Sequence, residues 1–189
     1  MRTTTRRDQI FDAVDRLIGR EGITAVSMRT VAAEAGVSLR LVQYYGTDKN
    51  TLVAASLQRL SDRSIRRWRE RRHPDDSLRA VIEGYFAATL PVDEETCAFH
   101  RISVSMELMA VTGTEPAASA YRRHLAATGT EFTDACLTAI PELGEDTAGS
   151  IVDTAMALGH GLGSLLMAGR VTEDAARATV AAMVADLPG

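Results

Sequence analysis

The sequence predicts an all-α protein of about nine helices, and three observations lead to this fold class. Apolar residues recur at the 3.6-residue period of a helix along almost the whole chain, and no segment shows sustained alternation or β-branched runs. Glycine, proline and capping side chains stand where each periodic stretch begins or ends. The 189 residues are 46% hydrophobic and 24% charged, which is typical of a globular protein and excludes disordered and fibrous classes.

Four helices are predicted in the N-terminal part of the chain. Ser27, Ser38 and Asp48 are good N-caps, because their side-chain oxygens accept hydrogen bonds from the free N–H groups of a first turn. Gly22 and Gly36 are positioned to end the helices that precede them. We therefore predict helices over residues 5–21, 27–36, 38–45 and 48–72.

Five longer helices are predicted in the rest of the chain. Pro91, Pro141 and Gly144 mark breaks between them, and Gly169 separates the last pair. Each segment carries one apolar stripe at helical spacing. The predicted helices cover residues 75–90, 94–112, 115–139, 146–168 and 172–186.

The net charge of −4 conceals an uneven distribution along the chain. Residues 1–72 carry 15 Lys and Arg against 8 Asp and Glu, a balance of +7, while residues 73–189 have a balance of −11. A basic block joined to an acidic block suggests that only the first part meets a polyanion such as DNA. Such an asymmetry also arises by chance, so it needs a motif beside it.

The chain has the features of a cytoplasmic protein without a membrane partner. Cys97 and Cys136 are far apart in the sequence, and the polar start MRTTTRR has no apolar region for secretion. The most apolar stretch, residues 150–169, contains Asp153 and His160 near its middle. We expect a buried helix there and not a membrane span.

Residues 27–45 carry the most informative pattern. Two short helices that cross steeply need small residues where they touch, a glycine at the turn and apolar residues at fixed offsets. Ala32, Gly36 and Val42 have this spacing, and Val31, Ala35, Val37 and Tyr45 complete the apolar set. The pattern predicts a helix-turn-helix, although a plain helical hairpin also tolerates a glycine in its turn.

The order of helices and the run from Ser27-Met28-Arg29 through residues 31–38 to Tyr44-Tyr45 and Lys49 resemble the TetR family of bacterial transcriptional regulators. The motif covers residues 6–53, while the remainder is similar only in the number and length of its helices. The family usually has Phe after the aromatic pair, where this chain has Gly46. Either that position is substituted or the register slips by one before Lys49.

The resemblance implies two domains with different functions. Residues 1–47 would form the DNA-binding domain and residues 48–189 a ligand-binding and dimerisation domain, with residues 48–72 as the linking helix. The implied function is a sequence-specific repressor that binds a pseudo-palindromic operator in double-stranded DNA as a homodimer. A small, largely apolar effector would release it. The competing hypothesis is a helical small-molecule-binding or protein-docking module that does not bind an operator.

The third predicted helix would lie in the major groove with its outward side chains against the base edges. Arg40 suits guanine, Gln43 suits adenine and Leu39 suits a thymine methyl group, and Tyr44 lies beside them. The residues placed for phosphate contacts are Ser27, Arg29, Ser38, Tyr44, Tyr45 and Lys49, the only lysine, although Tyr45 equally suits the core. We expect the arginines between residues 59 and 72 to meet the acidic C-terminal part and not DNA.

No catalytic pattern emerges, and we expect neither an enzyme nor a cofactor. The chain has no glycine-rich phosphate loop and no nucleophile elbow. Cys97 and His100 lie one helical turn apart, but two ligands are too few for a metal site.

The resemblance implies a cavity for a small molecule within the middle helices. Tyr85, Tyr121 and His124 are the best candidates for polar contacts, and the ordinary alternative for each lining residue is a place in the core. The candidate lining consists of Trp68, Tyr85, Phe86, Phe99, Met106, Met109, Tyr121, His124 and Phe132, with Cys136 on the same stripe.

The last two helices are the candidates for dimerisation. Gly159, Gly161 and Gly163 permit close approach of a neighbouring helix, although each lowers helix stability by about 1 kcal/mol. The predicted dimer face consists of Ile151, Ala155, Leu158, Leu162, Leu165 and Leu166.

Overall fold

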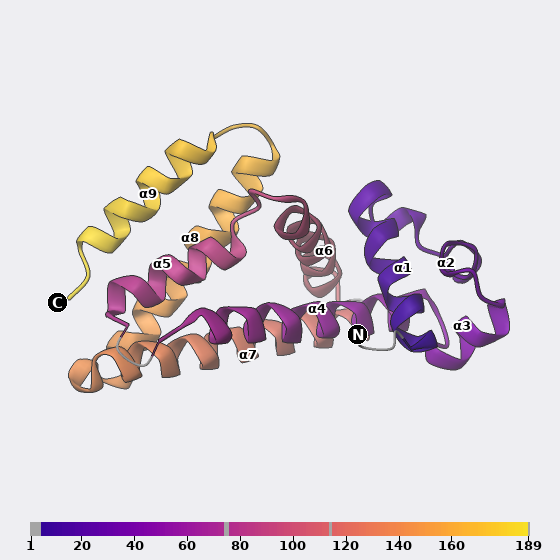
Figure 1. Cartoon of the computed structure of the whole chain (residues 1–189), viewed down its shortest axis with the longest axis horizontal. Coiled ribbons are helices and arrows are strands. Elements are labelled where there is room, and N and C mark those ends of the chain that lie inside the picture. The colour runs from indigo at the N-terminus through magenta and orange to yellow at the C-terminus, as the bar shows by residue number, and fades with distance from the viewer. Residues whose placement is uncertain (1–4, 74–75, 114, 189) are drawn as a thin grey trace. The chain divides into compact units, whose positions relative to one another are not determined.

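The computed structural model describes residues 5–73, 76–113 and 115–188, and within these ranges the chain forms nine α-helices, two short 3-10 helices and no strand (Figure 1). The all-α prediction is therefore confirmed. The α-helices are α1 (Arg6–Glu21), α2 (Met28–Ala35), α3 (Leu39–Tyr45), α4 (Lys49–Arg71), α5 (Leu78–Thr89), α6 (Glu94–Val111), α7 (Ala117–Ala139), α8 (Glu145–Met167) and α9 (Glu173–Ala185). The 3-10 helices are η1 (Ile23–Ala25) and η2 (Pro141–Leu143).

Side-chain caps determine where several of these helices begin. The hydroxyl groups of Ser27 and Ser38 accept hydrogen bonds from backbone N–H groups in the first turns of α2 and α3, as predicted. Helix α5 begins later than expected, because Ser77 caps it by accepting a hydrogen bond from the N–H of Ala80. The predicted start at Asp75 lies outside the described residues.

The contacts between residues divide the chain into two compact units. Unit 1 contains the chain up to Ser61 together with Arg101–His124, and unit 2 contains Asp62–His100 and the chain from Leu125 onward. Helices α4, α6 and α7 each contribute one part to unit 1 and another to unit 2. This division differs from the predicted boundary at residues 47 and 48, which was drawn by function; that boundary stays a prediction.

Unit 1 is built around the three N-terminal helices, which pack on one another (Figure 1). Its core also includes side chains from the first half of α4, the second half of α6 and the start of α7. Because apolar side chains from all these helices share one core, the orientation of α3 is tied to that of the first part of α4. The fully buried core residues include Ile10, Val14, Val31, Val42, Leu52, Leu57, Ile102 and Met106.

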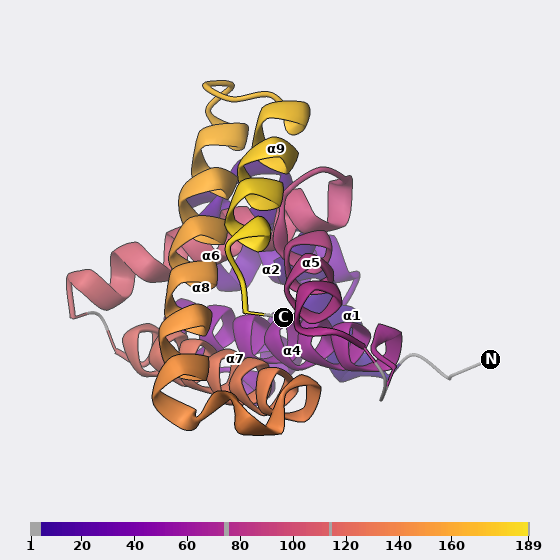
Figure 2. The same cartoon turned by 90° about the vertical axis from the view of Figure 1, so that its left-hand side faces the viewer.

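Unit 2 has its own core. Helices α5, α8 and α9 contact one another in pairs, and Figure 2 shows them side by side. Phe86 and Phe132 are among its largest fully buried side chains. None of the helices in the described part of the chain is long and apolar enough to cross a membrane.

Candidate functional site

The turn between α2 and α3 has the geometry of a helix-turn-helix. Gly36 ends α2 in the left-handed conformation with φ at 64°, which glycine adopts without strain, and its N–H donates to the carbonyls of Ala32 and Ala33. Val31 and Ala32 of α2 and Val42 of α3 are buried in the shared core. The predicted apolar contacts between α2 and α3 are thus confirmed. Because the Val42 side of α3 faces the core, the other side of this helix faces outward.

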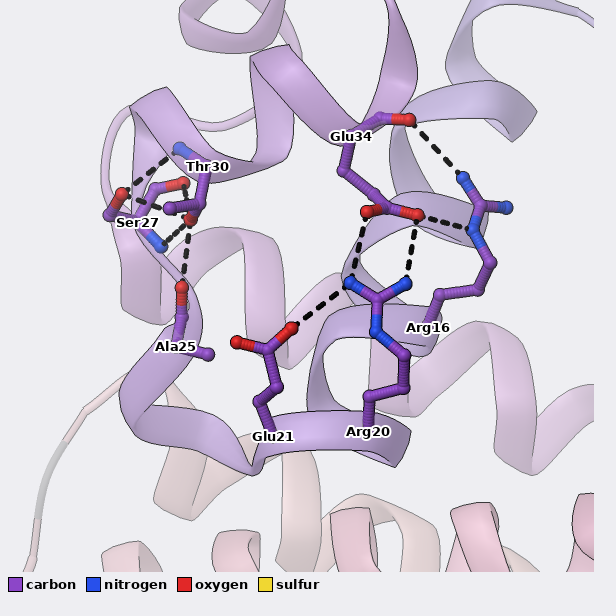
Figure 3. A network of polar contacts seen from close by, with 7 residues as sticks. All are labelled: Arg16, Arg20, Glu21, Ala25, Ser27, Thr30 and Glu34. Atoms are coloured by element: carbon purple, nitrogen blue, oxygen red, sulfur yellow. Dashed lines mark hydrogen bonds and ion pairs between the residues drawn. The ribbon is translucent and has the colours of Figure 1, made fainter.

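A polar network fixes α2 on α1 (Figure 3). The Glu34 carboxylate accepts hydrogen bonds from Arg16 Nε at 2.7 Å and from Arg20 at 3.1 Å. The Arg16 hydrogen bond, together with that of Arg20, lowers the pKa of Glu34, so the carboxylate stays charged. Sequence reasoning missed this network, because its partners are separated by 14 and 18 residues and no local pattern joins them.

The side chains predicted to read bases lie on the outer face of α3. Arg40 and Gln43 are exposed, Leu39 is 37% exposed and Tyr44 is 79% exposed. A large aromatic side chain so fully exposed on a short helix is available for a ligand. Tyr45 differs from these four, because it is half-buried, packs against the core and meets the Tyr44 ring edge-on at 5.0 Å.

The phosphate candidates lie at the starts of α2, α3 and α4. Ser27, Arg29 and Ser38 are exposed, and Lys49 is the half-buried first residue of α4. Asp48 Oδ1 accepts a hydrogen bond of 2.8 Å from the N–H of Thr51, and this backbone hydrogen bond lowers the pKa of Asp48. The cap therefore fixes the direction in which α4 begins, and Lys49 with it.

Gly46 is the C-cap residue of α3 and lies just before the start of α4. Its backbone is extended, with φ at −158°, and its N–H donates to Val42. A Cβ at this position would lie 2.5 Å from Leu52 Cδ2, and Leu52 is fully buried. The Leu52 side chain thus occupies the space that a larger residue at position 46 would need.

Replacing Gly46 by Ala should lower the free energy of unfolding by about 1 to 2 kcal/mol, because the core around Leu52 must move to admit the methyl group. Urea unfolding of the single variants and of the double variant Gly46→Ala, Leu52→Ala measures the coupling. We expect the double variant to lose clearly less stability than the sum of the two single losses. Additive losses would show that the two positions do not compete for space.

Four of the arginines between residues 59 and 72 form ion pairs: three meet the C-terminal part of the chain as predicted, whereas Arg59 pairs with N-terminal aspartates. In unit 1, Arg59 forms an ion pair with Asp15 at 3.3 Å and another with Asp12. In unit 2, Arg69 and Arg72 both bind Glu131 of α7, and Arg67 binds Glu95 of α6. The Arg69 guanidinium lowers the pKa of Glu131. These arginines hold helices together and are not presented as a free basic surface.

In unit 2 the structure brings four of the cavity candidates into one aromatic cluster. The Trp68 ring meets Phe132 edge-on at 5.2 Å and Tyr85 at 6.1 Å, and Tyr85 stacks on Phe132 at 4.4 Å. Phe86 lies 5.5 Å from Tyr85. Phe99 is half-buried and belongs to the same unit, on α6.

In unit 1 the remaining candidates belong to the core that also supports α1 to α3. Met106 is fully buried, Tyr121 is 7% exposed and Met109 packs against the same core. A hydrogen bond of 2.6 Å joins His124 Nδ1 to Ser61 Oγ of α4. Burial lowers the pKa of His124 to about 4 and, together with Glu107, raises that of Tyr121 to about 12. Both side chains are therefore neutral at pH 7.

Three buried side-chain atoms have no hydrogen-bond partner within the part of the chain that the structure describes. They are Trp68 Nε1, Ser103 Oγ and Thr128 Oγ1. The sequence prediction used Trp68 as an apolar wall and missed the other two residues. A serine or threonine inside an apolar helical stripe is the signal that could have drawn attention to them.

The predicted dimer face on α8 needs a correction. Ala155 is fully buried and Leu162 is 6% exposed, and both pack in the core of their own unit, so a second copy cannot cover them. Leu165 remains 42% exposed, while Ile151, Leu158 and Leu166 are partly buried.

Two of the three glycines on α8 serve contacts within the chain. A Cβ at Gly159 would lie 3.4 Å from the Tyr85 ring, and one at Gly163 would lie 2.5 Å from the His100 ring. A Cβ at Gly161 would meet nothing within 4 Å. The close approach predicted for a dimer therefore occurs inside unit 2 at Gly159 and Gly163.

Comparison with known proteins agrees with this geometry. Residues 10–56 match the family model for bacterial regulatory proteins of the tetR family. A 64-residue segment is 39% identical to the HTH-type nicotine-responsive transcriptional repressor HdnoR of Paenarthrobacter nicotinovorans, and it covers 34% of this chain and 33% of that protein. The chain thus matches about a third of the length of this curated relative.

Solved structures extend the similarity to nearly the whole chain. A crystal structure from Rhodococcus sp., described as a TetR-family transcriptional regulator, is 25% identical with a TM-score of 0.79, and the match covers 95% of this chain and 96% of that one. A regulator from Saccharomonospora viridis crystallised with choline is 18% identical with a TM-score of 0.76 and covers 95% of both chains, which shows the fold alone.

The fold and the exposed face of α3 define a helix-turn-helix protein of the DNA-binding class. Its residues 10–56 match the tetR family of bacterial regulatory proteins, and the chain shares its fold with the TetR-family structure from Rhodococcus sp..

Proposed function

We propose that the protein is a sequence-specific transcriptional regulator that acts in the cytoplasm, most simply as a repressor. The observation that carries this proposal is the outer face of α3, where Leu39, Arg40, Gln43 and Tyr44 are exposed while Val42 anchors the helix in the core. An exposed row of arginine and glutamine on the second helix of a helix-turn-helix suits the base edges of the major groove.

The operator we propose is pseudo-palindromic and bound by a homodimer. Two recognition helices related by a twofold axis would meet half-sites about 34 to 36 Å apart, or a multiple of this spacing. Leu165 and the open surface at Gly161 on α8 support a contact between two copies at this helix.

The regulator would respond to a small, largely apolar effector. We propose that the effector binds a conformation whose recognition helices are misplaced, so that binding shifts the population away from DNA. Reversing a population from 1:99 to 99:1 requires about 5.5 kcal/mol of differential affinity. Helix α4 is the proposed link, because Lys49 begins it and Trp68 lies near its other end.

A gel-shift experiment on the DNA that flanks the protein's own gene tests the proposal. We expect a discrete complex on one pseudo-palindrome that survives an excess of random duplex. Failure on every such sequence at low salt would favour the competing hypothesis of a helical binding module without an operator.

Replacing Lys49 by Ala should weaken binding to operator and random duplex alike. The lysine is placed for a phosphate, which carries no sequence information, so the logarithmic slope of affinity against salt should fall by about 0.9 per half-site. Fluorescence anisotropy over a salt series measures this slope. An unchanged slope would remove Lys49 from the phosphate contacts.

A further inference from the structure

An open groove lies between α5 and α9 of unit 2, two helices that are side by side in Figure 2. Its volume is about 370 Å³, within the range of about 300 to 1,000 Å³ that small-molecule sites occupy. Among its lining residues, the sequence analysis assigned only Phe86 to a ligand cavity. The groove is therefore a second place, beside the predicted cavity, where a ligand has room to bind.

The floor of the groove is apolar. Phe86 and Leu90 at the end of α5 and Ala176 and Val180 of α9 line it, and each is at most 7% exposed. Val92 belongs to the same lining and is 40% exposed, so the apolar surface continues to the edge of the groove. A ligand with an apolar body gains affinity here, because it removes this surface from water.

The charges at the rim are not balanced. Three charged residues of the described chain line the groove, namely Glu83, Glu173 and Arg177, so the lining has one negative charge in excess. Arg177 is engaged within the rim, because its Nε donates to Glu173 Oε1 at 3.0 Å. Glu83 meets Arg79 at 3.9 Å, and both side chains are more than half exposed, so this ion pair is weak. The Glu83 carboxylate is thus available to a cation.

The surroundings of the groove favour a cation over an anion. Residues 73–189, which include every lining residue, have a charge balance of −11 and attract positive charge. The N-terminal end of α9 would favour an anion through its helix dipole, but Glu173 and Asp174 in its first turn already supply negative charge there. A carboxylate or phosphate ligand would therefore meet like charges at this rim.

We propose that the groove between α5 and α9 binds a small amphipathic cation, such as an ammonium group carried on an apolar body. The apolar body lies on Phe86, Leu90 and Val180, and the ammonium group meets Glu83. This inference goes beyond the proposed function, because binding here needs unit 2 alone and not an operator. None of the lining residues belongs to α8, so the contact proposed there between two copies does not use them.

The test is a calorimetric titration of the full-length protein with three probes that share one apolar body. They are 4-phenylbutylamine, 4-phenylbutanol and 4-phenylbutyrate, which carry a positive, a neutral and a negative end at pH 7. The amine should bind about two- to fivefold more tightly than the alcohol, as expected for a partly exposed charge pair. The carboxylate should bind more weakly than the alcohol.

Glu83→Gln tests the charge contact without changing the size of the side chain. The variant should bind the amine and the alcohol equally, because the amide carries no charge, while the affinity for the alcohol stays unchanged. Glu142→Gln is the matched control, since Glu142 is an exposed carboxylate of the same unit that does not line the groove. It should keep the preference for the amine.

Ala181→Phe tests the room in the groove. Ala181 is exposed on α9 and lines the groove, so a phenyl ring at this position should take up part of its volume and weaken all three probes. Ala178→Phe is the matched control, because Ala178 is equally exposed on the same helix but does not line the groove. It should leave the three affinities unchanged.

Equal affinities for the three probes would overturn the proposal, as would a protein that binds none of them. A preference for the amine that survives Glu83→Gln, or equal effects of Ala181→Phe and Ala178→Phe, would contradict the assignment to this groove. Operator binding is measured on the same samples by fluorescence anisotropy. Absence of operator binding with a normal titration of the amine would contradict the proposed function and leave the groove site standing.

Discussion

The free energy of unfolding should fall by about 3 kcal/mol as the pH is lowered from 6.5 to 4, through one residue, His124. Its ring is 9% exposed, and burial lowers its pKa to about 4 from an ordinary value of 6.5. Below pH 6.5 the unfolded chain takes up a proton at this site that the folded protein does not. Stability is therefore complete above pH 6.5, falls between pH 6.5 and 4, and loses no more from this group below pH 4.

The groups around His124 do not cancel this dependence. Its Nδ1 is bonded to Ser61, and the Tyr121 ring lies 6.2 Å away with its pKa raised to about 12, so that ring stays neutral throughout the range. Glu107 acts on Tyr121, where it adds to the rise in pKa that burial causes. Carboxylates whose pKa is lowered, such as Glu131, also contribute to the free energy of unfolding. Their contribution is lost at a lower pH, and it is lost equally in the wild type and in every variant.

The measurement compares urea unfolding of the wild type and of His124→Asn over this pH range by far-ultraviolet circular dichroism. An asparagine keeps a polar atom near Ser61 but does not titrate. We expect the difference between the two proteins to shrink steadily from pH 6.5 to pH 4. Parallel stability curves would contradict the account of a neutral, buried His124.

Replacing Arg40 by Ala should lower affinity for the operator about 5- to 150-fold for each half-site it reads, which corresponds to about 1 to 3 kcal/mol. Arg40 is exposed on the outer face of α3, close to the N-terminal end of that helix. Removing a bidentate contact with guanine leaves the rest of the interface intact. Preference at one position of each half-site should then be relaxed, while binding to random duplex changes little.

Arg29→Ala provides the matched control for Arg40. Arg29 is also an exposed arginine, but it lies in the first turn of α2 and is placed for a phosphate. Its replacement should weaken binding to operator and random duplex by the same factor. If Arg40→Ala behaves in the same way as Arg29→Ala, Arg40 does not read a base.

The sequence was sufficient for those features that depend on local patterns. Ser27, Ser38 and Gly36 define the helix-turn-helix because capping and left-handed turns are properties of a few adjacent residues. The bond between Glu34 and Arg16 was not predictable, since a surface carboxylate has many sequence-compatible partners.

Apolar periodicity also has a limit that α8 makes clear. It indicates which residues are buried and not what covers them. Ala155 and Leu162 fitted a dimer face equally well, but the structure buries them in their own unit. The unpaired atoms of Trp68 and Thr128 were likewise beyond prediction, because pairing depends on rotamers and on neighbours distant in sequence.

The central claim, that the face of α3 reads a DNA sequence, is tested most directly by selecting bound sequences from a random duplex pool at two salt concentrations. The account predicts enrichment of one pseudo-palindrome, with affinity that falls steeply as salt rises. No enriched sequence, with only weak and salt-sensitive retention of the pool, would contradict it.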